Sequence, residues 1–229
     1  MRVSILKSVL VLALGLTFMP VSAQDAHDQS SHQGHSHSGQ TSQQGALGTS
    51  DETPDFTRGD IIYGAMDAPI EIIEYGSLTC PHCKLFMDEV ADYLKEDLIP
   101  SGKVRLVFRN FVRDQLDLAV SVASRCTSDM ELSKDLLESY FDKQVAWATS
   151  NDPKTTIFAI AAARGVDEEA LDKCLQSREM FEHVIGIAKV GHEKYQIQAT
   201  PTVIMNGEKV TFKGYDDLRA QINAAVAAN

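Results

Sequence analysis

The chain has 229 residues, of which 32 are acidic and 21 are basic, and its formal net charge is −11 at pH 7. Hydrophobic residues make up 44% of the sequence, which is enough to bury a core. The acidic balance argues against a nucleic-acid partner, because phosphate binding requires a basic surface.

The first 23 residues have the organisation of a secretory signal peptide. Two basic residues, Arg2 and Lys7, precede an apolar run from Val9 to Met19, and the small-residue segment Val21-Ser22-Ala23 follows. The alternative is a membrane anchor, but the run is shorter than the about 20 apolar residues that a spanning helix needs. We therefore predict cleavage after Ala23 and a periplasmic location for the mature chain.

Residues 24–54 are rich in Ser, Gln, Gly and His and almost lack aliphatic side chains. Such a segment buries too little apolar surface to offset the entropy lost on ordering, so we predict a disordered leader. His-rich tracts can bind metal. A solvated linker with incidental histidines is the favoured interpretation, and no metal site is assigned. The histidines are His27, His32, His35 and His37.

Residues 55–229 suit one domain that begins with a strand, a helix and a strand. The β-branched and apolar residues 70–75 predict a buried strand, which Gly76 ends. A second strand is predicted at 104–108. Between the two strands a helix is predicted to end near Pro100, since Leu85, Phe86, Val90 and Leu94 recur near helical period. The two strands of such a unit should lie parallel.

Helical patterns replace strand signals between about residues 115 and 182. Pro153 suits the first turn of a helix, Gly165 a helix end and Asp167 the cap of the next helix. The sequence therefore predicts an inserted helical domain in the middle of the fold.

The last part of the chain returns to strand and then helix. Strands are predicted at 202–205 and 209–212, joined by Asn206-Gly207, which is the strongest short signal for a hairpin. A final helix is predicted from about residue 215 to 227.

The most informative motif is Cys80-Pro81-His82-Cys83, at the start of the first predicted helix. If Cys80 is the N-cap, Pro81 takes the first helical position, where its missing N–H has no cost. The sulfur of Cys80 then faces unpaired N–H groups and the positive end of the helix dipole, which favour thiolate over thiol. His82 adds a donor or a positive charge beside this sulfur. Such a pair is suited to redox chemistry.

A second motif, Ala199-Thr200-Pro201-Thr202, precedes an apolar strand far downstream. With Cys80-Pro81-His82-Cys83 and Glu74, it makes the chain similar to DsbA-type thiol oxidases, of the branch with Thr before the loop proline. The similarity covers roughly residues 59–226. The resemblance implies a thioredoxin-like fold with an inserted helical domain, and a strongly acidic Cys80.

The resemblance also assigns roles to single residues. Glu74 matches a buried acid that helps to move the proton of the second cysteine, although a solvent-facing carboxylate is the usual state of Glu. Met87 stands where DsbA has another acid, which is a departure from the pattern. The resemblance implies a cis peptide bond before Pro201, and a main-chain contact between Thr200 and an extended client peptide. The alternative is a proline that begins a strand.

The other two cysteines, Cys126 and Cys174, fall in separate predicted helices of the insertion. In an oxidising compartment a structural disulfide is the favoured interpretation, and two buried free thiols are the alternative. A bridge that closes this loop would restrict the unfolded chain by about 4 kcal/mol in the entropy model.

A dithiol whose reduced form is stabilised gives up its disulfide readily, so the oxidised protein is expected to oxidise reduced secreted proteins. The resemblance implies a DsbB-type membrane oxidase as the partner that regenerates it. We expect a monomer that needs no cofactor. The alternatives are a disulfide isomerase or reductase of the copper-suppressor (ScsC) type and, ranked third, a protein that holds copper with its dithiol and leader histidines.

Overall fold

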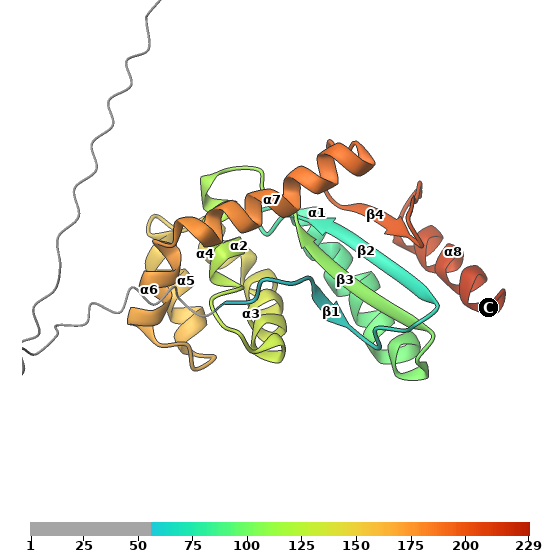
Figure 1. The fold of residues 1–229 in the computed structure, drawn as a ribbon, viewed down its shortest axis with the longest axis horizontal. Helices are drawn as coiled ribbons and strands as arrows, with labels where there is room; N and C mark the ends of the chain where they lie inside the picture. The colour runs from blue at the N-terminus through green and yellow to red at the C-terminus, as the bar shows by residue number, and fades with distance from the viewer. Residues whose placement is uncertain (1–55) are drawn as a thin grey trace, which may run out of the picture. The chain divides into compact units, whose positions relative to one another are not determined.

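The computed structural model describes residues 56–229, so the predicted signal peptide (1–23) and leader (24–54) lie outside the described residues. In the described part, five strands form one sheet in the order β1-β3-β2-β4-β5 (Figure 1). β2 and β3 are parallel, as predicted, and the other neighbours are antiparallel. The strands are β1 (Ile61–Tyr63), β2 (Ile70–Gly76), β3 (Val104–Asn110), β4 (Thr202–Met205) and β5 (Glu208–Lys209).

The helix between β2 and β3 starts as α1 (Pro81–Phe86) and runs on through two π-helical segments, η1 (Met87–Ala91) and η2 (Leu94–Leu98), and a 3₁₀ turn, η3 (Ile99–Ser101). Of the four residues that predicted it, Phe86, Val90 and Leu94 are buried, whereas Leu85 is exposed. None of the helices in residues 56–229 has the length and hydropathy to cross a bilayer.

Helices fill the chain between β3 and β4, as the sequence predicts. They are α2 (Gln115–Ala123), α3 (Met130–Asp142), α4 (Gln144–Ala148), α5 (Pro153–Ala162), α6 (Glu168–Leu175) and α7 (Arg178–Tyr195). Pro153 begins α5, and the Asp167 side chain caps α6 by accepting from the N–H of Ala170. The predicted boundary near residue 182 falls inside α7, which starts in the helical insertion and continues along the sheet (Figure 1).

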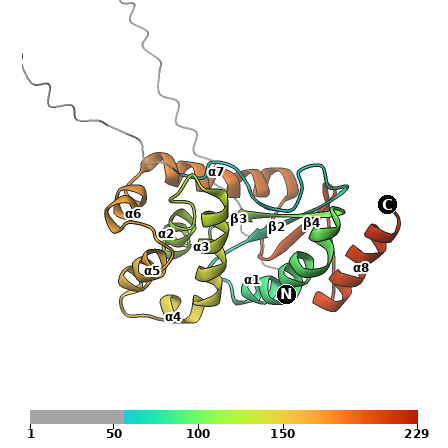
Figure 2. The same cartoon turned by 90° about the horizontal axis from the view of Figure 1, so that it is seen from below.

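The two faces of the sheet bury different sets of residues, because neighbouring side chains of a strand point to opposite sides. On β2, Ile70 and Ile72 pack with residues of α1, and Ile73 and Tyr75 pack with residues near the end of α7. In Figure 2, α1 and α7 lie on opposite sides of the sheet. The final helix α8 (Tyr215–Ala227), predicted at these bounds, packs on the same face of the sheet as α1. Glu74 lies two residues after Ile72 on β2, so its side chain points to the same face of the sheet, toward α1.

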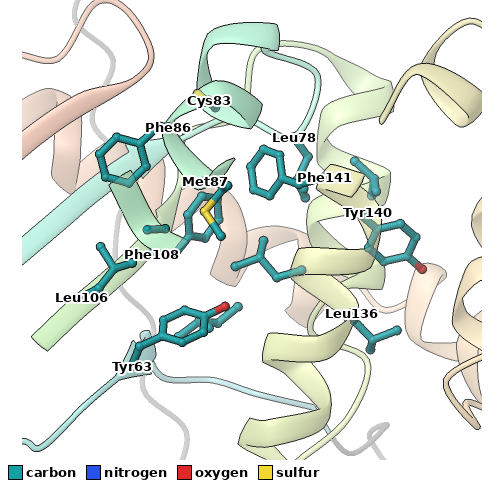
Figure 3. Close-up of a cluster of buried hydrophobic side chains, with 14 of the residues drawn as sticks. Tyr63, Leu78, Cys83, Phe86, Met87, Leu106, Phe108, Leu136, Tyr140 and Phe141 are labelled. Atoms are coloured by element: carbon teal, nitrogen blue, oxygen red, sulfur yellow. The ribbon is translucent and has the colours of Figure 1, made fainter. Parts of the chain in front are cut away.

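The helical insertion shares one continuous core with the sheet. The ring of Phe108 on β3 meets the ring of Phe141 on α3 edge to face, with centroids 5.7 Å apart. Figure 3 shows Phe141 and Leu78 gathered with Met87 in this seam, between the helix that carries Cys83 and α3. The insertion is therefore packed directly against the segment that carries the cysteine pair.

One strand is absent from the prediction and another was predicted with the wrong bounds. β1 was not predicted, because three residues are too short for a reliable pattern; pairing with β3 holds them in place. The strand predicted at 209–212 is wrong in length, since β5 is Glu208–Lys209. Val210 still donates to the carbonyl of Val203, but the chain then leaves the sheet and Phe212 packs against Tyr215.

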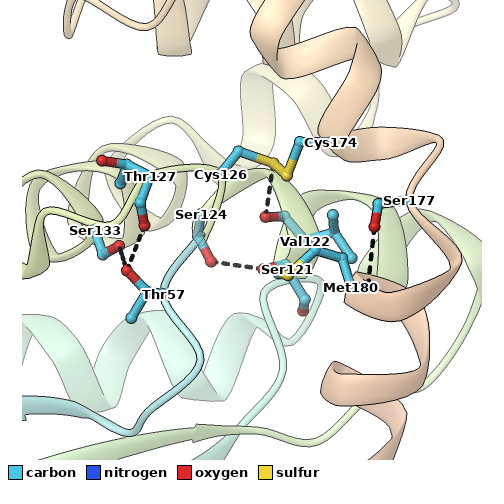
Figure 4. The surroundings of a disulfide bond; sticks show 10 residues. All are labelled: Thr57, Ser121, Val122, Ser124, Cys126, Thr127, Ser133, Cys174, Ser177 and Met180. Carbon is cyan, nitrogen blue, oxygen red and sulfur yellow. Dashed lines mark hydrogen bonds between the residues drawn. A yellow bond between two sulfur atoms is a disulfide. The ribbon is translucent and has the colours of Figure 1, made fainter. Parts of the chain in front are cut away.

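A disulfide joins Cys126 to Cys174, with Cα atoms 5.8 Å apart (Figure 4). Cys174 lies in α6, whereas Cys126 lies in the turn after α2 rather than in a helix. The start of the described chain is anchored beside it, because the Thr57 hydroxyl donates to the carbonyl of Thr127 at 2.6 Å. Both sulfurs are buried, as expected for a bond with a structural role.

Replacing both Cys126 and Cys174 by Ala should lower the free energy of unfolding by about 2 to 4 kcal/mol, because the unfolded chain gains the freedom of the opened loop. Urea denaturation of the two proteins, each with Cys80 and Cys83 reduced, measures this difference. The variant should retain the pKa of Cys80. A loss below about 1 kcal/mol would contradict a stabilising role for the bond.

Candidate active site

Cys80 is the N-cap residue of α1, in extended backbone conformation, and Pro81 follows at the first helical position, as the sequence predicts. The N–H groups of Cys83 and Lys84 donate to the Cys80 carbonyl at 3.1 and 3.2 Å and close the first turn. No side chain caps this helix start. The N–H groups that a Ser or Asp would normally satisfy are those of His82 and Cys83, and here they face the Cys80 sulfur, with that of Cys83 shared with the Cys80 carbonyl.

The loop before Cys80 is held by two side chains of the helical insertion. The Asp117 carboxylate on α2 accepts from the N–H of Leu78 at 2.9 Å and from the N–H of Arg113 at 3.0 Å. The Gln144 amide on α4 donates to the carbonyls of Leu78 and Cys80 at 2.8 and 3.0 Å. Both side chains are buried, so the insertion fixes the position of the cysteine pair. Neither residue was among the predicted site residues.

Cys80 carries the more acidic thiol of the pair, because its pKa is lowered to about 5. A hydrogen bond from the Cys83 thiol is the largest cause, and burial acts in the opposite direction. A hydrogen bond from the Thr200 side chain and the main-chain N–H groups of Cys83 and His82 lower the pKa further. At neutral pH the sulfur of Cys80 is therefore a thiolate.

Cys83 lies in the opposite environment. It has no exposed surface, and its sulfur accepts from the N–H of Ser77 at 3.3 Å. Burial raises the pKa of the Cys83 thiol strongly, and so do its hydrogen bond to Cys80 and the charge of Glu74. It therefore remains protonated while Cys80 is ionised.

Glu74 is a buried acid and not a solvent-facing carboxylate, since none of its surface is exposed. Neither carboxyl oxygen has a hydrogen-bond partner of good geometry within residues 56–229. Burial raises the pKa of Glu74 well above its usual value, the Cys80 charge raises it further, and the nearby Cys83 thiol acts against both. Gly76 makes room for this carboxyl group, because a Cβ there would lie 2.9 Å from Glu74 Oε1.

The second motif lies against the first. The Thr200–Pro201 peptide bond is cis, and the Cys80 sulfur lies 3.5 Å from the carbonyl oxygen of Thr200. Beside them is a cavity of about 290 Å³, which His82, Thr200, Pro201, Phe212, Lys213, Gly214 and Tyr215 line. The side chain of His82 is exposed at this cavity. The main-chain N–H of His82 is one of the donors that lower the pKa of Cys80.

Two further predictions concern this region. Met87 is buried behind the pair and supplies no charge, so Glu74 is the acid that influences the pKa of Cys83. Residues 56–229 contain no group of three His, Cys, Asp or Glu side chains that could hold a metal ion. The leader histidines lie outside the described residues.

This chain therefore has the fold and the site of a class of proteins in which an acidic thiol at a helix start faces a loop with a cis-proline. The family model described as Thioredoxin matches residues 57–224, and the chain belongs to this family. The predicted fold class, a thioredoxin-like fold with an inserted helical domain, is confirmed.

Relatives support the predicted resemblance to DsbA-type proteins. A protein from Rickettsia bellii, whose name places it among the protein-disulfide oxidoreductases, is 27% identical over 167 residues, which cover 73% of this chain and 64% of the relative. Disulfide bond formation protein D of Bacillus subtilis is 26% identical, over 72% of this chain and 76% of that protein. The crystal structure of Wolbachia pipientis alpha-DsbA1 has a TM-score of 0.64, with 27% identity over 72% of this chain and 88% of that chain. The chain thus spans less than two thirds of the length of its Rickettsia relative.

In the reduced protein, the thiolate absorbance of Cys80 should titrate near pH 5. This pKa lies below the about 8.5 of an unfolded cysteine, so the resulting stabilisation is complete above the unfolded value and is lost as the pH falls through the folded value. The free energy of unfolding should therefore rise between these pH values by up to about 1.4 kcal/mol per unit, relative to Cys80→Ser. Equal pH dependence of the two proteins would contradict a Cys80 thiolate.

Proposed function

We propose that this chain is an exported thiol:disulfide oxidoreductase that donates disulfide bonds to reduced, folding secreted proteins through Cys80 and Cys83. The observation that carries the proposal is the contrast within the pair, a Cys80 pKa of about 5 beside a buried Cys83 with a raised pKa. Because this contrast stabilises the reduced pair, the disulfide form is an oxidant. The signal-peptide pattern of residues 1–23 supports a periplasmic location.

The reaction begins when a client thiolate attacks the sulfur of Cys80 in the oxidised pair. The Cys80–Cys83 bond breaks, a mixed disulfide forms, and Cys83 leaves with the electron pair and takes up a proton. A second client thiolate then attacks the client sulfur of the mixed disulfide. Cys80 leaves as a thiolate, which its environment stabilises. The client gains a disulfide, and two electrons pass to the cysteine pair.

The proton in the first step is assigned to Glu74. The departing sulfur of Cys83 is buried, where a thiolate is strongly disfavoured. Burial raises the pKa of Glu74 well above its usual value, which favours the protonated acid, and Glu74 has no other hydrogen-bond partner of good geometry among residues 56–229. The acid can therefore give up its proton to Cys83, and take it back when the pair is oxidised again.

Client binding is assigned to the loop that faces Cys80. The main chain of Thr200 can pair with an extended peptide, and such pairing tolerates many client sequences. The cavity beside Pro201 has room for a side chain next to the client cysteine. Broad client specificity follows.

Each turnover leaves the pair reduced, so a DsbB-type membrane oxidase is proposed as the electron acceptor. The chain is proposed to act as a monomer without a cofactor.

Reduced ribonuclease A distinguishes this function from that of a disulfide isomerase or reductase. The oxidised protein should remove free thiols from the reduced substrate within minutes, and its equilibrium with glutathione should give a potential between about −180 and −120 mV. Scrambled ribonuclease A is the parallel substrate, and Cys80→Ser is the inactive control. Activity on the scrambled substrate alone would overturn the proposal and favour the isomerase.

The variant Glu74→Gln should slow breakage of the Cys80–Cys83 disulfide by a client peptide by roughly 10²-fold, because the proton donor is lost. Glu71→Gln is a matched control, since Glu71 lies on the same strand but pairs with Arg105 at the edge of the core. Stopped-flow measurement over a range of pH gives both the rate and its profile. Equal rates and profiles in Glu74→Gln and the natural protein would rule out this role.

A further inference from the structure

Tyr215, the first residue of α8, reaches across to the first turn of α1. Its hydroxyl donates to the carbonyl of His82, with the two oxygens 2.6 Å apart. The ring is fixed on both sides, since it meets Phe86 edge to face and lies beside Phe212, each with centroids 6.0 Å apart. From the sequence, this tyrosine was predicted only as the start of a helix.

The carbonyl that Tyr215 contacts belongs to the same peptide group as the N–H of Cys83. That N–H lies at the helix start, where it donates to the Cys80 carbonyl at 3.1 Å, and it is also one of the donors that lower the pKa of Cys80. A hydrogen bond to the carbonyl of a peptide group draws electron density from its nitrogen and makes its N–H a stronger donor. The contacts thus form one chain, from the Tyr215 hydroxyl through the His82–Cys83 peptide group to the sulfur of Cys80.

We propose that Tyr215 is a positioning residue for the redox pair, which holds and polarises the His82–Cys83 peptide group so that its N–H stabilises the Cys80 thiolate. The proposal rests on the function proposed above and adds a residue that acts on the sulfur without touching it. Burial raises the pKa of Tyr215, and so do the nearby charges of Glu74, Cys83 and Cys80. The hydroxyl therefore remains a donor throughout the range in which Cys80 titrates.

The competing explanation is that Tyr215 merely fastens α8 to the helix after Cys80. The structure offers a matched control for this, because a second tyrosine joins the same two helical segments further from the sulfur. The hydroxyl of Tyr93, between η1 and η2, donates to Asn223 on α8 at 2.7 Å. Removing that hydroxyl loosens the same junction and leaves the His82 carbonyl untouched.

The experiment compares Tyr215→Phe, Tyr93→Phe and a protein with 3-fluorotyrosine at position 215, whose hydroxyl is a stronger donor. The readouts are the pKa of Cys80 from thiolate absorbance and the equilibrium with glutathione, neither of which involves a client. In Tyr215→Phe the pKa should rise by roughly 0.1 to 0.7 unit, since a cooperative contact adds about 10 to 30% to a hydrogen bond. The equilibrium constant for reduction by glutathione should fall by the same factor, up to about 5-fold.

The fluorinated protein should shift both quantities in the opposite direction, and it keeps the ring and its packing, so it remains informative if Tyr215→Phe folds poorly. Tyr93→Phe should match the natural protein. The inference is overturned if the fluorinated protein does not differ from the natural one, or if Tyr93→Phe shifts the pKa as much as Tyr215→Phe. A Cys80 pKa near 8.5 in the natural protein would instead reject the proposed function itself.

Discussion

The sulfurs of Cys80 and Cys83 lie one helical turn apart in opposite electrostatic environments, and the other features of the site depend on this difference. Cys80 is at the helix start, where main-chain N–H groups have no side-chain cap and can stabilise an anion. Cys83 is inside the first turn, where burial excludes an anion. Each sulfur reinforces the other, because the protonated Cys83 donates the hydrogen bond that contributes most to the acidity of Cys80.

The helical insertion is part of this arrangement rather than an accessory to it. A helix N-terminus stabilises a sulfur only if the loop before it keeps the sulfur above the N–H groups. That loop is held by Asp117 and Gln144, which come from two different helices of the insertion. The shared core between Phe108 and Phe141 fixes the insertion against the sheet. The redox site is therefore built by both parts of the chain.

Features that depend on neighbouring residues were predictable from the sequence. Pro81 at the first helical position, the Asp167 cap and the turn at Asn206-Gly207, whose φ values are 49° and 87°, all follow from local backbone preferences. Asp117, Gln144 and Tyr215 were missed because the residues of the cysteine motif and its loop that they contact lie 39 to 133 positions away in the chain. Glu74 was found only because the resemblance pointed to it, since a strand pattern does not reveal whether an acid is paired.

The contrast between the two buried acids near the pair indicates which of them can exchange a proton. Burial raises the pKa of both Glu74 and Asp117. The carboxylate of Asp117 accepts two main-chain hydrogen bonds that hold the loop, so protonating it would weaken the site. Glu74 has no such bonds within residues 56–229. In the proposed mechanism its charge can therefore change during a redox cycle without disturbing the backbone, and its neighbour Cys83 is the group whose proton moves.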